Sequence, residues 1–417
     1  MRNLQLGLVK AVPSNDGSVL AADFGSMGVL PSTFTFTRAS DGSYWDVDGV
    51  LQTASSNVER IDHPPGGRPG LLLEGQRTNS FARSTTISHG AWTKNAVTTP
   101  SNSGESPAET TSYFVTEDGT TASHSISQSV TTTAVEWTLS AFVRRPASSS
   151  RDFVYLSLTD FESSEINVWF DLTDGTIGTI GGGVARSIEE CANGWYRVTL
   201  TVECIAGANA ARVGISSADN QVSYAGDDAS RVEVWGAQLE AGSFATSFIT
   251  TTVSPVVREA DSVTITGSNF TDFYSASSGT FLVECGMLGG SAADSTTRSI
   301  LVVSDGTDSE RHDLTSVAGA NPRLLTVDST TQADITSASA VAAGAKSKLA
   351  VGFAANDVTV AKDGTAETPD GTASMPAPAT LYLGRSHTAS QELFGHVHSL
   401  RFWAARRTDS EMQGLTS

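Results

Sequence analysis

The sequence predicts an all-β protein, with two jelly-roll or β-sandwich domains in tandem behind a turn-rich N-terminal segment. Short runs rich in Val, Thr, Trp and Tyr alternate apolar and polar residues, as strands with one buried face do. Small polar residues fill the gaps, and charged residues make up only 17% of the chain. A chain of 417 residues suggests two or three domains. We place them at residues 1–80, 81–255 and 256–417.

Residues 1–80 predict irregular structure with two hairpin turns. The pairs Asp41-Gly42 and Asp48-Gly49 flank a short alternating segment, and glycine accepts the positive φ that tight hairpins need. Residues 63–70, HPPGGRPG, combine three prolines with three glycines and predict a connector without helix.

The sequence of the middle domain predicts an antiparallel sandwich, because its runs of alternating apolar and polar residues are short and no segment with helical periodicity separates them. The candidate strands are residues 136–145, 152–160, 165–173, 194–204, 210–218 and 231–240. Residues 246–262 contain Pro255 and predict a linker strand toward the last domain.

The last domain repeats this pattern and ends in a predicted helix. Its candidate strands are residues 280–288, 299–306, 323–329, 348–364, 379–385 and 395–405. Residues 407–417 predict a helix capped by Asp409 or Ser410, with Glu411 in its first turn.

Charge and cysteine content exclude several classes of protein. A net charge of −19 argues against nucleic-acid binding, which needs clustered Lys and Arg. The first 17 residues lack the apolar core of a signal peptide, and no apolar run approaches the ~20 residues that span a bilayer. For Cys191, Cys204 and Cys285, we expect free buried thiols, with a Cys191–Cys204 disulfide as the alternative.

Four sequence blocks, in order, carry a likeness to a known group of proteins. They are FTRASDGSYWDVDGVLQT (36–53), LLLEGQRTNSF (71–81), AWTK (91–94) and EVWGAQLEAGSFATSFI (233–249), followed by Arg258, Ala260 and Asp261. This combination resembles tailed-bacteriophage virion proteins, in which such blocks flank a carbohydrate-binding-like sandwich. The stretch before Leu71 is shorter here than in that group.

The last third is similar to a concanavalin A-like or laminin G-like jelly roll. The segments that carry this resemblance are SGTFLVECGM (278–287), LYLGRSH (381–387) and GHVHSLRFWAARRTDSEMQGL (395–415).

Together these resemblances imply a virion fibre or spike protein, a tail fibre first and a head fibre second. They imply a homotrimer located in the virion and assembled in the host cytoplasm. Residues 1–80 would dock to other virion proteins, while the sandwiches attach to host-surface polysaccharide. The alternatives are a structural decoration protein without a ligand and a glycan-degrading depolymerase.

Carbohydrate binding directs attention to aromatic side chains that alternation places opposite the core, because sugars stack on exposed rings. Tyr155 and Trp169 are the candidates in the middle domain, and Arg385 and His387 follow a strand end in the last domain. For each aromatic residue, the alternative is a buried packing role.

Catalytic and metal sites are less well supported. Glu165 and Asp171 share one strand face, but their separation exceeds that of a glycosidase pair, so we expect no enzyme activity. His396 and His398 also share a face, without a third metal ligand in view. We expect no cofactor, with Ca²⁺ in the acidic turns as a weak alternative.

The stretch LLLEGQRTN at 71–79 predicts a structural junction. Leu71 to Leu73 would form an anchoring strand, while Glu74, Arg77 and Asn79 satisfy charge and backbone groups beyond it. A buried arginine–carboxylate pair is the specific expectation here.

Overall fold

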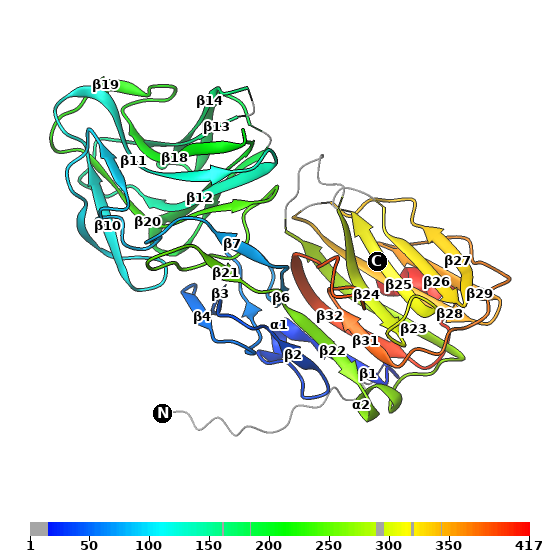
Figure 1. The fold of residues 1–417 in the computed structure, drawn as a ribbon. Coiled ribbons are helices and arrows are strands. Elements are labelled where there is room, and N and C mark those ends of the chain that lie inside the picture. Colours follow the sequence, from blue (N-terminus) through cyan, green and yellow to red (C-terminus); the bar gives the residue numbers. More distant parts are fainter. Residues whose placement is uncertain (1–15, 161, 184, 289–295, 318–320, 343) are drawn as a thin grey trace, which may run out of the picture.

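Four antiparallel sheets form two lobes in the computed structural model, which describes residues 16–160, 162–183, 185–288, 296–317, 321–342 and 344–417 (Figure 1). The first 15 residues of the predicted docking segment therefore lie outside the described residues. We call the lobe built from residues 93–241 the central lobe and the other the terminal lobe. Strand content and sheet arrangement confirm the predicted all-β, two-sandwich fold class.

The central lobe packs a six-stranded sheet against a seven-stranded sheet. The first has the order β16-β17-β12-β20-β10-β9 and the second β15-β14-β13-β18-β11-β19, with β8 also on β11. The strands are β8 (Thr93–Asn95), β9 (Ser101–Glu105), β10 (Thr111–Thr116), β11 (Thr121–Thr132), β12 (Glu136–Arg144), β13 (Phe153–Thr159), β14 (Glu165–Asp171), β15 (Thr176–Ile180), β16 (Ala185–Glu190), β17 (Trp195–Glu203), β18 (Gly207–Ser216), β19 (Ser223–Ala225) and β20 (Arg231–Ala241). A 3₁₀ turn, η1 (Ala192–Gly194), links β16 to β17.

The terminal lobe has the same two-layer plan, and N-terminal strands complete both of its sheets. One sheet has the order β30-β29-β28-β23-β32-β6-β5, with β1 also on β32, and the other β2-β22-β31-β24-β25-β26-β27. The strands are β1 (Leu20–Asp23), β2 (Thr35–Thr37), β5 (Ile61–Asp62), β6 (Gly70–Leu73), β22 (Ser262–Thr266), β23 (Ser278–Met287), β24 (Thr297–Ser304), β25 (Glu310–Val317), β26 (Arg323–Asp328), β27 (Thr330–Thr336), β28 (Lys346–Ala354), β29 (Asp357–Lys362), β30 (Thr365–Ala366), β31 (Thr380–Leu383) and β32 (Gly395–Trp403). The N-terminal segment is thus part of this lobe's architecture, with Leu71 and Leu73 of β6 in its core.

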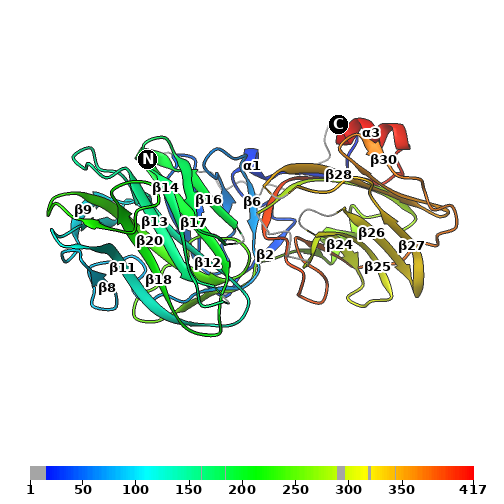
Figure 2. The ribbon, with the colours of Figure 1, turned by 90° about the horizontal axis from the view of Figure 1, so that it is seen from above.

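Two short ribbons lie between the lobes. They are the hairpin β3 (Gly42–Trp45) with β4 (Leu51–Ala54), and the pair β7 (Arg77–Asn79) with β21 (Val256–Arg258). Trp45 and Leu51 of the hairpin pack on an aromatic cluster of the central lobe that contains Phe142, Trp195 and Trp235. Seen from above, the two lobes lie side by side with β6 between them (Figure 2).

One of the two predicted N-terminal hairpins is present and the other is wrong. Asp48-Gly49 does lie in the β3–β4 turn, where the Asp46 carboxylate accepts hydrogen bonds from the backbone N–H groups of Asp48 and Val50. Asp41-Gly42 makes no hairpin, because the preceding strand β2 pairs with β22, more than 200 residues away in the chain. Tertiary pairing overrides the local turn signal there.

The helices are short: α1 (Phe24–Met27), α2 (Ser268–Thr271) and α3 (Asp409–Thr416). The predicted C-terminal helix is confirmed, but its cap is Thr408 and not Asp409 or Ser410. Thr408 and Glu411 form a capping box, in which each side chain accepts from the other residue's backbone N–H. Among the described residues, no helix has the length and apolar character needed to cross a membrane.

All three cysteines are buried free thiols, so the alternative Cys191–Cys204 disulfide is excluded. Burial raises the pKa of each thiol to about 12, which makes all three unreactive at neutral pH.

Candidate functional site

A buried charge network joins the lobes beyond the end of β6. Arg60 donates to Glu74 at 2.7 Å and to Asp261 at 2.5 Å, and all three side chains are 0% exposed. Arg258 lies 3.0 Å from Glu74, and Arg38 lies 3.1 Å from Asp261. The network thus contains three arginines and two carboxylates from four separate chain segments.

Neutral groups form the remaining hydrogen bonds of this network. Glu74 also accepts from the backbone N–H of Ser247 at 2.8 Å and from its hydroxyl at 2.6 Å. Arg258 donates to the carbonyl of Gly75 at 2.7 Å. Burial opposes the ionisation of Glu74, but Arg258, Arg60 and the Ser247 bonds outweigh it and hold the pKa of this carboxyl well below its usual range. Glu74 is therefore ionised at any physiological pH.

The three residues predicted for the junction have three different environments. Glu74 is in the network, paired with Arg60 and Arg258 instead of the nearby Arg77. Arg77 lies 3.7 Å from Glu240 and stacks on Phe394 with 4.4 Å between guanidinium carbon and ring centroid. Asn79 is fully buried.

Asn79 bridges backbone groups of the central lobe. Its amide nitrogen donates to the carbonyl of Ile249 at 2.8 Å, and its oxygen accepts from the N–H groups of Phe81 and Leu239. Sequence reasoning missed the partners Arg38 and Arg60. The available signal was the set of arginines and carboxylates within the quoted blocks, since Arg38, Glu74, Arg258 and Asp261 all belong to them.

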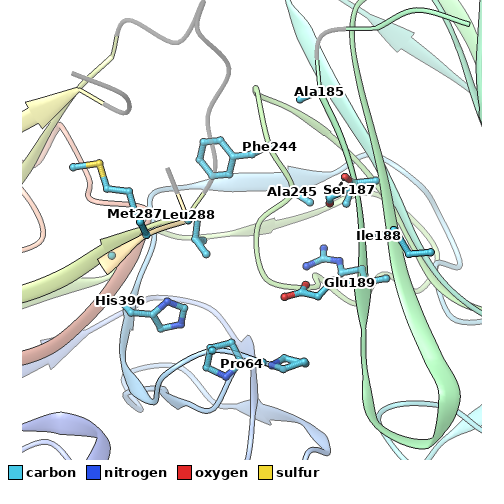
Figure 3. A pocket seen from close by; sticks show the side chains of 18 of the residues that line it. Pro64, Ala185, Ser187, Ile188, Glu189, Phe244, Ala245, Met287, Leu288 and His396 are labelled. Carbon is cyan, nitrogen blue, oxygen red and sulfur yellow. Dashed lines mark hydrogen bonds between the residues drawn. The ribbon is translucent and has the colours of Figure 1, made fainter. Parts of the chain in front are cut away.

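A cleft of about 840 Å³ lies between the lobes. Its central-lobe wall is the outer face of β16 and β17, and its terminal-lobe wall is the end of β23 with β32. Figure 3 shows Ser187 and Glu189 on the first wall, with Leu288 and His396 opposite them across the gap. Residues Pro64 to Arg68 of the proline–glycine connector contribute to its lining.

Hydroxyl groups cover the central-lobe wall of the cleft. Ser187 and Thr199 are cross-strand partners whose hydroxyls lie 2.7 Å apart, and Thr201 bonds Thr138 at 2.8 Å. Arg197 lies in the same row as Glu189 and donates to the Thr246 carbonyl at 2.7 Å. The desolvation of Glu189 between the lobes raises the pKa of its carboxyl, although Arg197 opposes this. This wall offers donors and acceptors of the kind that bind polar ligands.

The two histidines on β32 line the opposite wall as a stacked pair. Their ring centroids are 6.1 Å apart, and both residues are buried. Nε2 of His396 lies 2.7 Å from a carboxylate oxygen of Asp62, and Nδ1 of His398 lies 3.0 Å from the Pro69 carbonyl. Each ring thus has a protein partner, and the described residues contain no group of three or more potential metal ligands.

The acidic turns suggested for Ca²⁺ fold back on themselves. Asp305 accepts from the N–H and hydroxyl of Thr307, and Asp370 does the same with Thr372. These are Asx turns, in which the carboxylate replaces a backbone acceptor.

Tyr155 and Trp169 lie side by side opposite the central core, as alternation predicted. They are cross-strand partners with ring centroids 5.9 Å apart, while their neighbours Val154 and Val168 enter the core. However, Tyr155 is 0% exposed and Trp169 is 3% exposed. Stacking on a sugar requires an exposed ring face, so burial assigns both rings the alternative packing role.

Arg385 and His387 follow β31 in the terminal lobe and are not among the residues that line the cleft. Nε2 of His387 lies 3.2 Å from the exposed Asp308, whereas Arg385 has no hydrogen bond or ion pair to any described residue. The structure does not bring these two residues together with Tyr155 and Trp169, so the four do not form one site.

No family model and no curated protein matches this chain. Solved structures with some likeness include a CBM40 domain of a Ruminococcus gnavus sialidase, at 12% identity over 34% of this chain and 84% of that one, with a TM-score of 0.30. A tandem CBM22 domain from Paenibacillus barcinonensis has 11% identity over 82% and 98% of the two chains, with a TM-score of 0.24. The LG4-5 domains of the mouse laminin alpha1 chain have 11% identity over 84% and 96%, with a TM-score of 0.23. At these scores the likeness carries no argument about function.

Proposed function

We propose that this chain is a bacteriophage virion protein, a tail or head fibre, that attaches to a glycan on the host surface. The cleft between the two lobes is its binding site. The single observation that carries the proposal is this 840 Å³ cleft, whose wall presents hydroxyls and charged groups while a fully buried charge network fixes the two lobes beside it.

The composition of the cleft fits a polar ligand. Ser187, Thr199 and Thr201 are hydroxyl residues, and each hydroxyl can donate or accept a hydrogen bond as sugar hydroxyls do. The sequence blocks that resemble phage virion proteins supply the location and the context. In that context the chain is a homotrimer held by other virion proteins, and it binds without catalysing a reaction.

Multivalency makes weak contacts sufficient. Once one subunit is bound, its neighbours on the same particle bind from a high effective concentration, so avidity exceeds single-site affinity by about 10²–10⁴. A cleft that makes only weak contacts with a single glycan can therefore support firm attachment.

The test uses the purified full-length chain on immobilised bacterial surface polysaccharides and on whole cells. Saturable binding that competes with phage adsorption supports the proposal, whereas binding to neither cells nor polysaccharide favours a structural spacer. Release of reducing sugar from a bound polysaccharide would instead identify a depolymerase. Immunogold labelling of virions with an antibody to this chain distinguishes tail from head.

A further inference from the structure

We propose that the cleft recognises an acidic glycan, one whose repeating unit carries carboxylate or phosphate groups. This inference rests on the proposed function, because it names the class of ligand for the same site.

The charge of the cleft is opposite to that of the molecule. Three cationic side chains face it, Arg68, Arg197 and Lys346, against the single carboxylate of Glu189 among the lining residues. Arg186 also borders the cleft, but it pairs with the core residue Leu200 and so points to the other face of β16. The whole chain carries 45 carboxylates and 26 Lys and Arg residues. An excess of cations in a protein with a net charge of −19 therefore marks this surface as distinct.

These cations are incompletely neutralised by the protein. Lys346 is 65% exposed, and its nearest carboxylate is Glu284 at 4.0 Å. Arg68 contacts the same Glu284, so two cations share one carboxylate as their partner.

Arg197 keeps its charge available in a different way. Its guanidinium donates to neutral acceptors, the Thr246 carbonyl at 2.7 Å and the Ser140 hydroxyl at 3.2 Å. Glu189 is its strand neighbour and offsets part of the charge. The remaining balance of the cleft is positive, and carboxylates and phosphates are the groups that arginine binds best.

The apolar lining gives the same indication. Neutral sugars are held largely by stacking on aromatic faces, but Phe244, the aromatic residue of this lining, is only 7% exposed. It is covered by Arg77 and Arg298, whose guanidinium carbons lie 5.7 and 5.0 Å from its ring centroid. Recognition in this cleft therefore depends on charge and hydrogen bonding.

The overall negative charge does not prevent such binding. At about 0.15 M salt the Debye length is roughly 8 Å, so distant surface carboxylates are screened while contacts within the cleft persist. The same negative field disfavours long, uniformly charged nucleic acids.

The experiment measures binding of the full-length chain to an array of purified bacterial polysaccharides of neutral, uronic-acid and phosphate-containing classes. We expect binding to be confined to the acidic classes. Chemical reduction of the carboxyl groups, or removal of phosphate with hydrofluoric acid, then identifies which anionic group the protein binds. Reduction should abolish binding to the uronic-acid class, and removal of phosphate should abolish binding to the phosphate-containing class.

Variants locate the effect. R68S/K346S removes two cleft cations, whose side chains are 39% and 65% exposed, and should weaken binding to the acidic polysaccharide by about tenfold. The control R323S/R401S makes the same change in net charge outside the cleft, at residues that are 47% and 40% exposed, and should leave affinity unchanged. Thermal unfolding of both variants verifies that they fold.

The outcomes separate the two proposals. Equal binding to neutral polysaccharides, with R68S/K346S unaffected, would overturn the acidic-glycan inference and leave glycan attachment intact. Binding to no member of the array and to no cells would overturn both. Loss of affinity in the control as well as in the cleft variant would show a general charge effect and would also contradict the inference.

Discussion

Replacing Glu74 by glutamine tests whether the buried charge network holds the lobes together. The substitution keeps the shape of the side chain but removes the charge shared by Arg60 and Arg258, at 2.7 and 3.0 Å. Among the described residues, Glu74 is the only carboxylate within ion-pair distance of Arg258, which is fully buried. The new amide also places an N–H₂ group among donors that need an acceptor.

The expected loss is large because one partner of a buried ion pair is removed. Such changes lower the free energy of unfolding by about 3–5 kcal/mol, since they leave an uncompensated charge away from water. The matched control is D334N, which breaks the Arg323–Asp334 pair at 2.6 Å, where the side chains are 47% and 46% exposed. An exposed pair of this kind contributes roughly 0–1 kcal/mol.

Urea unfolding followed by tryptophan fluorescence measures both variants. E74Q should shift the first unfolding transition well below that of the wild-type chain, and D334N should barely move it. If E74Q lost no more stability than D334N, the network would not be holding this junction and our reasoning about it would be refuted.

Three further predictions concern stability. Burial lowers the pKa of His312 to about 3, so between about pH 6.5 and 3 the unfolded chain binds a proton that the folded chain does not. The free energy of unfolding should therefore fall as pH drops through that window. H312Q should make the midpoint of urea unfolding less dependent on pH there, and an unchanged pH dependence would contradict this. A Cβ on Gly214 would lie 2.1 Å from the ring of the buried Tyr155, so G214A should lower the free energy of unfolding by about 1–3 kcal/mol. The control G90A adds a Cβ that meets nothing within 4 Å and should leave the free energy of unfolding nearly unchanged. T408A removes the cap of α3 and should reduce the free energy of unfolding by about 1 kcal/mol, as measured by calorimetry. An unchanged value would show that this helix end contributes nothing to folding stability.

Strands in which apolar and polar residues alternate could be predicted from the sequence. Residues 136–145 and 194–204 correspond to β12 (Glu136–Arg144) and β17 (Trp195–Glu203), because Val, Leu and Trp alternate with polar residues there. The long strand β11 was missed because its outer row consists of serine and threonine, including Ser125 and Ser127, while polar residues interrupt the apolar Ile126 and Val130 of its inner row. Hydroxyl residues on both faces hide the period of two.

Long-range partnerships could not be read in the same way. Arg60 meets Asp261 across 201 positions of sequence, and His396 meets Asp62 across 334. The two walls of the cleft are likewise far apart in sequence, since one belongs to β16 and β17 and the other to β23 and β32. Burial also limits sequence reasoning: alternation correctly placed Tyr155 opposite the core, but it could not show that the ring would be covered.

The most direct test of the account is a crystal structure of the full chain with an oligosaccharide fragment of a polysaccharide that it binds. Our account predicts sugar between β16 and β32, with an anionic group within hydrogen-bonding distance of Arg68, Arg197 or Lys346. Sugar bound instead over Tyr155 and Trp169, or at Arg385 and His387, with the cleft empty, would contradict it.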